Sequence, residues 1–140
     1  MTIAKRVISS ICLFILIACS NEQTNVTTKD VNTSDLDQSL QTWVQNNSKE
    51  IGIYIKKINE NNDQTEEINY LIYSRKDLSY DYRVTKSKLE NGTLSIYLND
   101  KMASNDQFVK KESLAIITLK TQPKKIELYL NDKTANYIIE

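Results

Sequence analysis

Hydrophobic and polar positions along the chain follow a helical period before residue 50 and a strand period after it. Between residues 34 and 46, apolar side chains recur at spacings of three and four, which predicts one amphipathic helix. Its apolar stripe consists of Leu36, Leu40, Trp43 and Val44. The helix is expected to start at Ser34 or Asp35, with Ser34 as its cap, and to end near Asn46. Trp43 is expected to belong to the core.

From residue 51 onward, apolar and polar residues alternate in short runs, the pattern of half-buried strands. The expected strands are Ile51–Ile58, Ile68–Ser74, a third through Tyr80, Tyr82 and Val84, Thr93–Leu98, Lys111–Lys120, Lys124–Leu130 and a short one at Tyr137–Ile139. Asn91-Gly92 is a strong hairpin signal and joins the third strand to the fourth. Residues 59–67 form a polar loop, and Asp106–Lys110 could add one helical turn.

These elements predict an α+β fold with a single domain over residues 34–140. In it, the N-terminal helix packs on a mainly antiparallel sheet of five to seven strands. A two-sheet β-sandwich is the alternative. Residues 19–33 are predicted to be a disordered tether, because Val26 and Val31 are their only aliphatic side chains and cannot offset the entropy of ordering.

One strand–turn unit occurs twice, at a spacing of 32 residues. The segment from Leu94 to Lys101 matches the segment from Ile126 to Lys133, and an alanine follows each two residues later. In each copy three aliphatic side chains face one side and a tyrosine faces the other, and Asn-Asp is expected to start a turn. Tyr97 and Tyr129 therefore point away from the predicted core and form the candidate binding surface, since tyrosine suits protein and sugar contacts.

The N-terminus has the organisation of an export signal. Lys5 and Arg6 precede an apolar run too short to span a bilayer, and the sequence turns polar after Cys19. Leu16-Ile17-Ala18-Cys19 resembles the lipobox of bacterial lipoprotein signal peptides. The resemblance implies removal of residues 1–18 and acylation of Cys19. The mature protein is then expected on a bacterial cell membrane, held by lipid and facing outside the cytoplasm.

Composition excludes several classes of protein. The 140 residues include 18 basic and 18 acidic ones, and loss of Lys5 and Arg6 with the signal leaves a formal charge of −2, which argues against a nucleic-acid partner. The chain has no histidine. Of its two cysteines, Cys12 lies in the signal and Cys19 is expected to carry the lipid, so no disulfide is expected. Histidine- or cysteine-based catalysis and the usual zinc sites are thereby excluded. No cofactor or metal is expected.

Acidic residues give no clear catalytic or calcium-binding pattern. The loop 59–67 lacks the carboxylates and the central glycine of an EF-hand. Asp77, Asp81, Glu90, Glu112 and Glu127 are scattered singly among lysines, whereas carboxylate-based hydrolysis needs a facing pair. The sequence therefore favours a protein that is not an enzyme.

From Ile68 to about Leu130 the chain resembles the C-terminal domain of PrcB-type protease-complex subunits. The residues that carry the resemblance include Tyr70-Leu71-Ile72-Tyr73-Ser74, Ser79-Tyr80-Asp81-Tyr82-Arg83-Val84, the hairpin into Leu94–Leu98, and Leu114–Leu119 with Pro123. Leu78-Ser79-Tyr80 stands where that family has a glycine-rich turn. The resemblance implies a non-catalytic accessory that binds another exported protein. The sequence-based hypothesis is accordingly a surface-tethered binding module for an exported protein or an envelope polymer. The alternatives are an immunity or inhibitor lipoprotein and a carboxylate-only envelope hydrolase.

Overall fold

The computed structural model describes residues 26–58, 66–76, 80–102 and 111–140, with only the backbone described at 80–82, 101 and 102. The helical elements are a 3-10 turn η1 (Thr33–Asp35) and the helix α1 (Gln38–Asn47). The strands within these residues are β1 (Thr27–Asp30), β2 (Gly52–Ile58), β3 (Ile68–Arg75), β4 (Tyr80–Glu90), β5 (Thr93–Met102), β6 (Glu112–Leu119), β7 (Lys125–Leu130), β8 (Lys133–Thr134) and β9 (Ile138–Ile139). The polar loop's residues 59–65 and the helical turn expected at Asp106–Lys110 lie outside the described residues.

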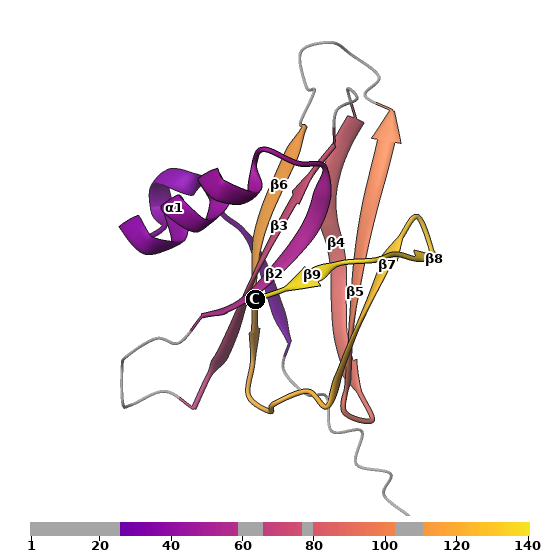
Figure 1. Cartoon of the computed structure of the whole chain (residues 1–140). Coiled ribbons are helices and arrows are strands. Elements are labelled where there is room, and N and C mark those ends of the chain that lie inside the picture. Colours follow the sequence, from indigo (N-terminus) through magenta and orange to yellow (C-terminus); the bar gives the residue numbers. More distant parts are fainter. Residues whose placement is uncertain (1–25, 59–65, 77–79, 103–110) are drawn as a thin grey trace, which may run out of the picture.

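The strands form two sheets, so the expectation of a single sheet is wrong while the α+β class is confirmed. Sheet A has the order β1-β6-β3-β2-β9, and sheet B has the order β4-β5-β7-β8 (Figure 1). Most neighbours are antiparallel, as expected, but β2–β9 and β5–β7 are parallel. The chain passes from one sheet to the other after β3, β5, β6 and β8, and these crossings divide the strands into two layers.

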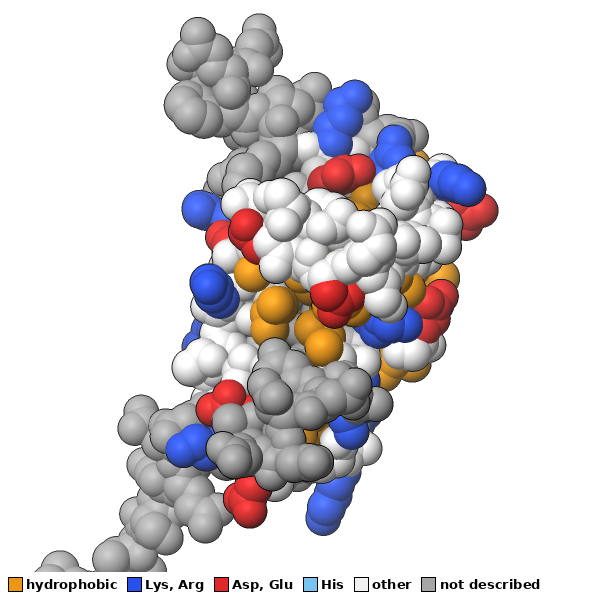
Figure 2. Space-filling view, turned by 90° about the vertical axis from the view of Figure 1, so that its left-hand side faces the viewer, with side chains coloured by type: hydrophobic (Ala, Val, Ile, Leu, Met, Phe, Trp, Pro, Cys, Tyr) orange, Lys and Arg blue, Asp and Glu red, His pale blue; other side chains and the backbone are white. Residues whose placement is uncertain are grey.

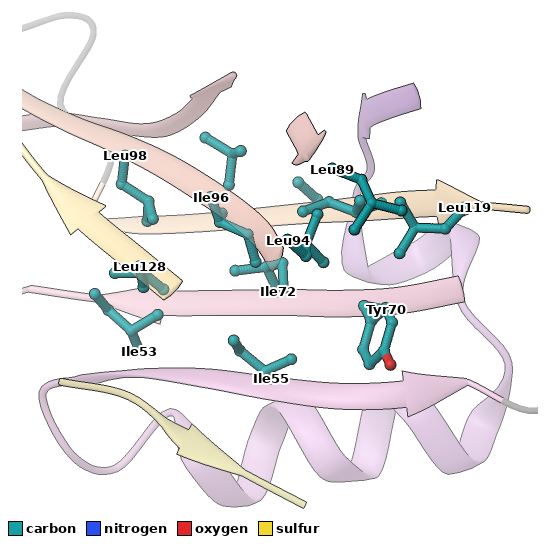
Figure 3. Packing of buried hydrophobic residues seen from close by; sticks show 13 residues of the cluster. Ile53, Ile55, Tyr70, Ile72, Leu89, Leu94, Ile96, Leu98, Leu119 and Leu128 are labelled. Atoms are coloured by element: carbon teal, nitrogen blue, oxygen red, sulfur yellow. The ribbon is translucent and has the colours of Figure 1, made fainter. Parts of the chain in front are cut away.

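The main core lies between the two sheets. Sheet A contributes Ile53, Ile55, Tyr70, Ile72, Ala115, Ile117 and Leu119, and sheet B contributes Val84, Leu89, Leu94, Ile96, Leu98 and Leu128. Figure 3 shows these side chains pointing toward one another from the two layers. Most are completely buried, so this layer supplies the largest part of the hydrophobic stabilisation.

Helix α1 covers the opposite face of sheet A and builds a second core there. Leu36, Leu40, Trp43 and Val44 are buried as predicted, against Tyr54, Leu71, Tyr73 and Leu114. The edge of the Trp43 indole meets the Tyr73 ring at 6.4 Å between centroids. Figure 2 looks onto this side and shows an uncharged polar surface over the helix, bordered by hydrophobic side chains. Central strand β3 is therefore buried on both faces.

The helix begins later than predicted. Asp37 caps it by accepting a hydrogen bond from the Leu40 amide at 2.9 Å, and Ser34 belongs to the preceding 3-10 turn. In that turn, the Asp35 carboxylate accepts the Asn32 amide and side chain. Asp35 and Asp37 thus each accept a hydrogen bond from a backbone amide at the start of a helical element, which is the role of N-terminal capping residues.

The predicted disordered tether is wrong for residues 26–33. Thr27–Asp30 form strand β1, which pairs antiparallel with β6 from Thr27↔Thr118 to Asp30↔Ala115. All four side chains of β1 are exposed. The strand is therefore held by backbone hydrogen bonds and by the contact between Thr28 and Ser87, and not by apolar burial. Hydrophobic patterning cannot detect such a strand. Residues 19–25 lie outside the described part of the chain.

The two copies of the repeated unit lie side by side in register. β5 and β7 are parallel neighbours, and their pairing runs from Thr93↔Lys125 to Leu98↔Leu130, always joining residues 32 apart. The hairpin at Asn91-Gly92 is confirmed, with positive φ at both residues, as a type I′ turn needs. Asn131-Asp132 turns in the same way, with φ of 49° and 63°. Asn99-Asp100, by contrast, continues β5, so the turn expected there is wrong.

Candidate functional site

Tyr97 and Tyr129 lie together on the outer face of sheet B. They are register partners on β5 and β7, and their rings stack with centroids 4.9 Å apart and an interplanar angle of 13°. This separation equals the usual spacing of paired strands, so the parallel register itself sets the stack. Both side chains are partly exposed. The sequence correctly placed both residues away from the core, where Leu94, Ile96 and Leu98 are fully buried.

Glu127 joins the tyrosine pair to a lysine. Its carboxylate accepts hydrogen bonds from Lys125 Nζ at 2.6 Å and from the Tyr129 hydroxyl at 2.7 Å. These two bonds, the lysine's first, lower the pKa of Glu127. The bond to Glu127 correspondingly raises the pKa of Lys125 and that of Tyr129. At neutral pH the face therefore presents one protonated phenol fixed in orientation beside a closed ion pair.

Strand β4 supplies the remaining side of this face. Lys86 pairs with Tyr97, and Lys88 and Glu90 form a second ion pair between alternate residues, at 2.9 Å. A β-bulge between Val84 and Lys86 interrupts the edge strand, and the Thr85 hydroxyl donates to the Tyr97 carbonyl there. Lysines and a bulge on an edge strand discourage uncontrolled strand pairing. The candidate binding surface is therefore the sheet face rather than the β4 edge.

The other tyrosines whose side chains are described are committed to the interior or to structural contacts. Tyr54, Tyr70 and Tyr73 are at most 4% exposed. The Tyr137 hydroxyl donates to the Ile126 carbonyl at 2.9 Å. Among the described side chains, Tyr97 and Tyr129 are thus the tyrosine pair whose rings meet on an outer sheet surface.

A polar cavity of about 340 Å³ lies beside the C-terminal end of β1, where the first residues of β6 extend beyond β1. β1 pairs with β6 only as far as Ala115, which leaves Glu112–Leu114 as part of the cavity wall beside Asp30. Asp30 and Glu112 bring two carboxylates to one cavity, together with Arg83 and Tyr73. No local sequence pattern indicates this pair, because the two acids are 82 residues apart along the chain.

Tyr73 lines this cavity, and the ionisation of its phenol can be followed through the stability of the protein. Burial, and then the hydrogen bond that its hydroxyl donates to Glu112 at 2.9 Å, raise the pKa of Tyr73 far above the ordinary 10.0. A raised phenol pKa means that the folded state keeps a proton that the unfolded chain loses. The resulting stabilisation is complete below the ordinary tyrosine range and declines as pH rises above about 10.

We therefore expect the free energy of unfolding of the natural protein to fall more steeply between pH 10 and 11.5 than that of Tyr73→Phe. Urea unfolding at fixed pH values measures both slopes. Tyr97→Phe is the comparison variant, because the Tyr97 side chain is partly exposed on the outer face of sheet B. Equal slopes in the natural protein and Tyr73→Phe would show that Tyr73 ionises at the same pH in both states.

One polar cluster that the sequence did not indicate connects the two sheets. The Asp100 carboxylate on β5 accepts hydrogen bonds from Lys76, which follows β3, and from the Asn131 side chain in the turn after β7. The Asn131 side-chain oxygen also accepts the Asp100 amide at 3.1 Å. Only the three-dimensional pairing of distant strands brings these groups together, so no local sequence signal could have identified them.

Among the described residues, no group of three or more acidic, histidine or cysteine side chains is placed to hold a metal ion. Within the same ranges there is no helix with the length and apolar character needed to cross a bilayer. Cys19, the predicted lipidation site, lies outside the described residues.

No protein-family profile, curated protein or solved structure matches the chain. Inferences about function therefore depend on the chain's own residues and geometry.

Proposed function

We propose that this protein is a lipid-anchored, non-catalytic binding module on the outer side of a bacterial membrane. Its contact surface is the outer face of sheet B, and its partner is an exported protein or an envelope polymer. The observation that carries the proposal is the stacked, partly exposed pair of Tyr97 and Tyr129. Tyrosine is enriched among the residues that dominate binding energy at protein interfaces.

The geometry of the pair favours a protein over a sugar. Sugars usually stack on an open ring face, but here each ring covers one face of the other. The stacked rings are flanked by the Lys125–Glu127 and Lys88–Glu90 ion pairs. Such a mixture of aromatic rings and fixed charges suits the hydrogen-bonding groups of a protein surface. An inhibitor or immunity lipoprotein could use the same face.

The lipid attachment is tested by Cys19→Ser. We expect the variant to carry no acyl group and to leave the membrane fraction. Mass spectrometry and membrane sedimentation in high salt measure these properties. Cys12→Ser, which changes the other cysteine, should leave both unchanged. Sedimentation of Cys19→Ser with membranes at high salt would contradict the anchor.

The contact surface is tested by replacing Tyr97 and Tyr129 together with threonine, which retains strand propensity. We expect at least tenfold weaker capture of the partner, about 1.4 kcal/mol, because two anchor side chains are lost. The cost in stability should stay within about 2 kcal/mol, since the rings are partly exposed and their stacking contributes about 1 kcal/mol. Affinity purification of the mature protein from its native envelope, with quantitative mass spectrometry, provides the measurement.

The matched control is Lys88→Thr with Glu90→Thr, which removes an ion pair from the same face without touching the aromatic stack. This control should capture the partner within about threefold of the natural protein, as expected for charges at an interface rim. Full capture by the folded tyrosine variant would exclude the outer face of sheet B as the contact surface.

The cavity lined by Asp30 and Glu112 is the observation that favours a second candidate, a carboxylate-only hydrolase. A pair of acids across a cavity is the minimum requirement for glycoside hydrolysis. One oxygen of Glu112 already accepts the Tyr73 hydroxyl, however, so that acid has a structural partner. The binding module is therefore the function that the geometry supports better.

A further inference from the structure

Strand β7 is paired unequally on its two sides. β5 pairs with it over all six residues, whereas β8 pairs only with Tyr129 and Leu130. One more backbone bond, from the Ala135 amide to the Leu128 carbonyl at 2.9 Å, extends the β8 side. Within the described residues no strand lies beside Lys125–Glu127 on that side.

A groove of about 320 Å³ runs along this part of the β7 edge. One wall is Lys125–Tyr129, and the other is Thr134–Tyr137, the segment that leads from β8 toward β9 (Figure 1). The Ile126 carbonyl points away from β5 into the groove, where it accepts the Tyr137 hydroxyl. The Tyr137 hydroxyl thus makes the hydrogen bond that a backbone amide of a neighbouring strand would otherwise donate.

We propose that this groove binds an extended segment of the protein partner, which adds antiparallel to β7 beside Lys125–Glu127. The proposal rests on the proposed function and specifies how the partner is held. Strand addition provides backbone hydrogen bonds, and the side chains of alternate residues provide specificity. The groove is continuous with the candidate surface, because Glu127 and Tyr129 belong to both.

The charges of Lys125 and Glu127 determine which partner segment the groove prefers. Lys125 and Glu127 are on the same face and are separated by one residue. An antiparallel strand places its residues opposite Glu127, Ile126 and Lys125 in that order. Opposite charges in directly facing positions stabilise a strand pair, and like charges destabilise it. The preferred segment therefore carries a basic residue, a small residue beside Tyr137, and an acidic residue.

The experiment uses two blocked tetrapeptides, lysine–alanine–glutamate–threonine and glutamate–alanine–lysine–threonine. Their titration into the ¹⁵N-labelled mature protein is followed by NMR. We expect the first to bind about tenfold more tightly, since two facing charge pairs change sign between the peptides. The amide signal of Ile126 should shift on binding. N-methylation of the peptide's alanine should abolish binding, because this alanine's amide would donate to the second lone pair of the Ile126 carbonyl, which already accepts the Tyr137 hydroxyl.

The exchange variant Lys125→Glu with Glu127→Lys should reverse the preference between the peptides. The matched exchange Lys88→Glu with Glu90→Lys, on β4 outside the groove, should leave the preference unchanged. Equal binding of the two peptides by the natural protein, or undiminished binding of the N-methylated peptide, would overturn the proposal. If these results occur while partner capture still requires Tyr97 and Tyr129, the proposed function stands and only strand addition is excluded.

Discussion

Replacing Trp43 with alanine is expected to lower the free energy of unfolding by about 3–5 kcal/mol, the usual cost of emptying a buried tryptophan site. Trp43 is 7% exposed and is the part of α1 that meets Tyr73. Its indole N–H also donates to the Glu140 carboxylate at 2.5 Å, and Lys56 Nζ lies 5.7 Å from the ring centroid. One substitution therefore loosens the helix, sheet A and the C-terminal segment together. Urea denaturation followed by circular dichroism measures the loss.

Two variants separate these contributions. Trp43→Phe keeps an aromatic ring against Tyr73 but removes the indole N–H, so its loss should be smaller than that of Trp43→Ala. Gln45→Ala changes an exposed position on the same helix and should leave the unfolding midpoint nearly unchanged. A loss below about 1 kcal/mol for Trp43→Ala would contradict the packing of α1 on sheet A.

Removing the Asp100 carboxylate with alanine is expected to cost about 2–3 kcal/mol, because hydrogen bonds to a charged group contribute more than neutral ones. The side chain is 9% exposed and receives both Lys76 and the Asn131 amide. Its loss disconnects the end of β3 from β5 and frees the turn that follows β7. The free energy of unfolding by urea, at low and at high salt, measures the effect.

The comparison variants for Asp100 are Asp100→Asn and Glu90→Ala. Asparagine retains an oxygen acceptor without the charge, so its effect should fall between those of the natural protein and alanine. Glu90→Ala breaks an ion pair in which the acid is 66% exposed, and it should leave stability unchanged. A similar loss in the free energy of unfolding from Glu90→Ala and Asp100→Ala would contradict a larger contribution from the bonds between the sheets than from an exposed ion pair.

The sequence was sufficient to predict the helix and most of the strands, but not β1 or β8. The stripe through Trp43 identified the helix, and alternation around Ile96 and Leu128 identified inward and outward side chains. The division into two sheets could not be predicted, because alternation shows which side chains face inward but not which strands are neighbours. Ile51, expected to begin the strand that ends at Ile58, is 59% exposed because it precedes β2.

The candidate site was predictable in part for the same reason. The outward direction of Tyr97 and Tyr129 follows from the period of a strand, but their stacking requires the parallel pairing of β5 and β7. The contacts of Glu127 could have been anticipated, since Lys125, Glu127 and Tyr129 alternate on one strand. The acids of the cavity, Asp30 and Glu112, meet only through the pairing of β1 with β6.

The incorporation of β1 into sheet A limits how far the domain can stand from the lipid. With Cys19 as the proposed anchored residue, seven residue steps separate it from Val26, a fully extended reach of about 25 Å. A free segment to residue 33 would reach about twice as far. The start of β1, the Asn91-Gly92 hairpin and the β6–β7 connection lie at one end of the domain (Figure 1), which the proposed anchoring at Cys19 places nearest the membrane. The Asp30–Glu112 cavity lies at the other end of β1, so under the same proposal a partner would approach it from the side or from outside and not from beneath.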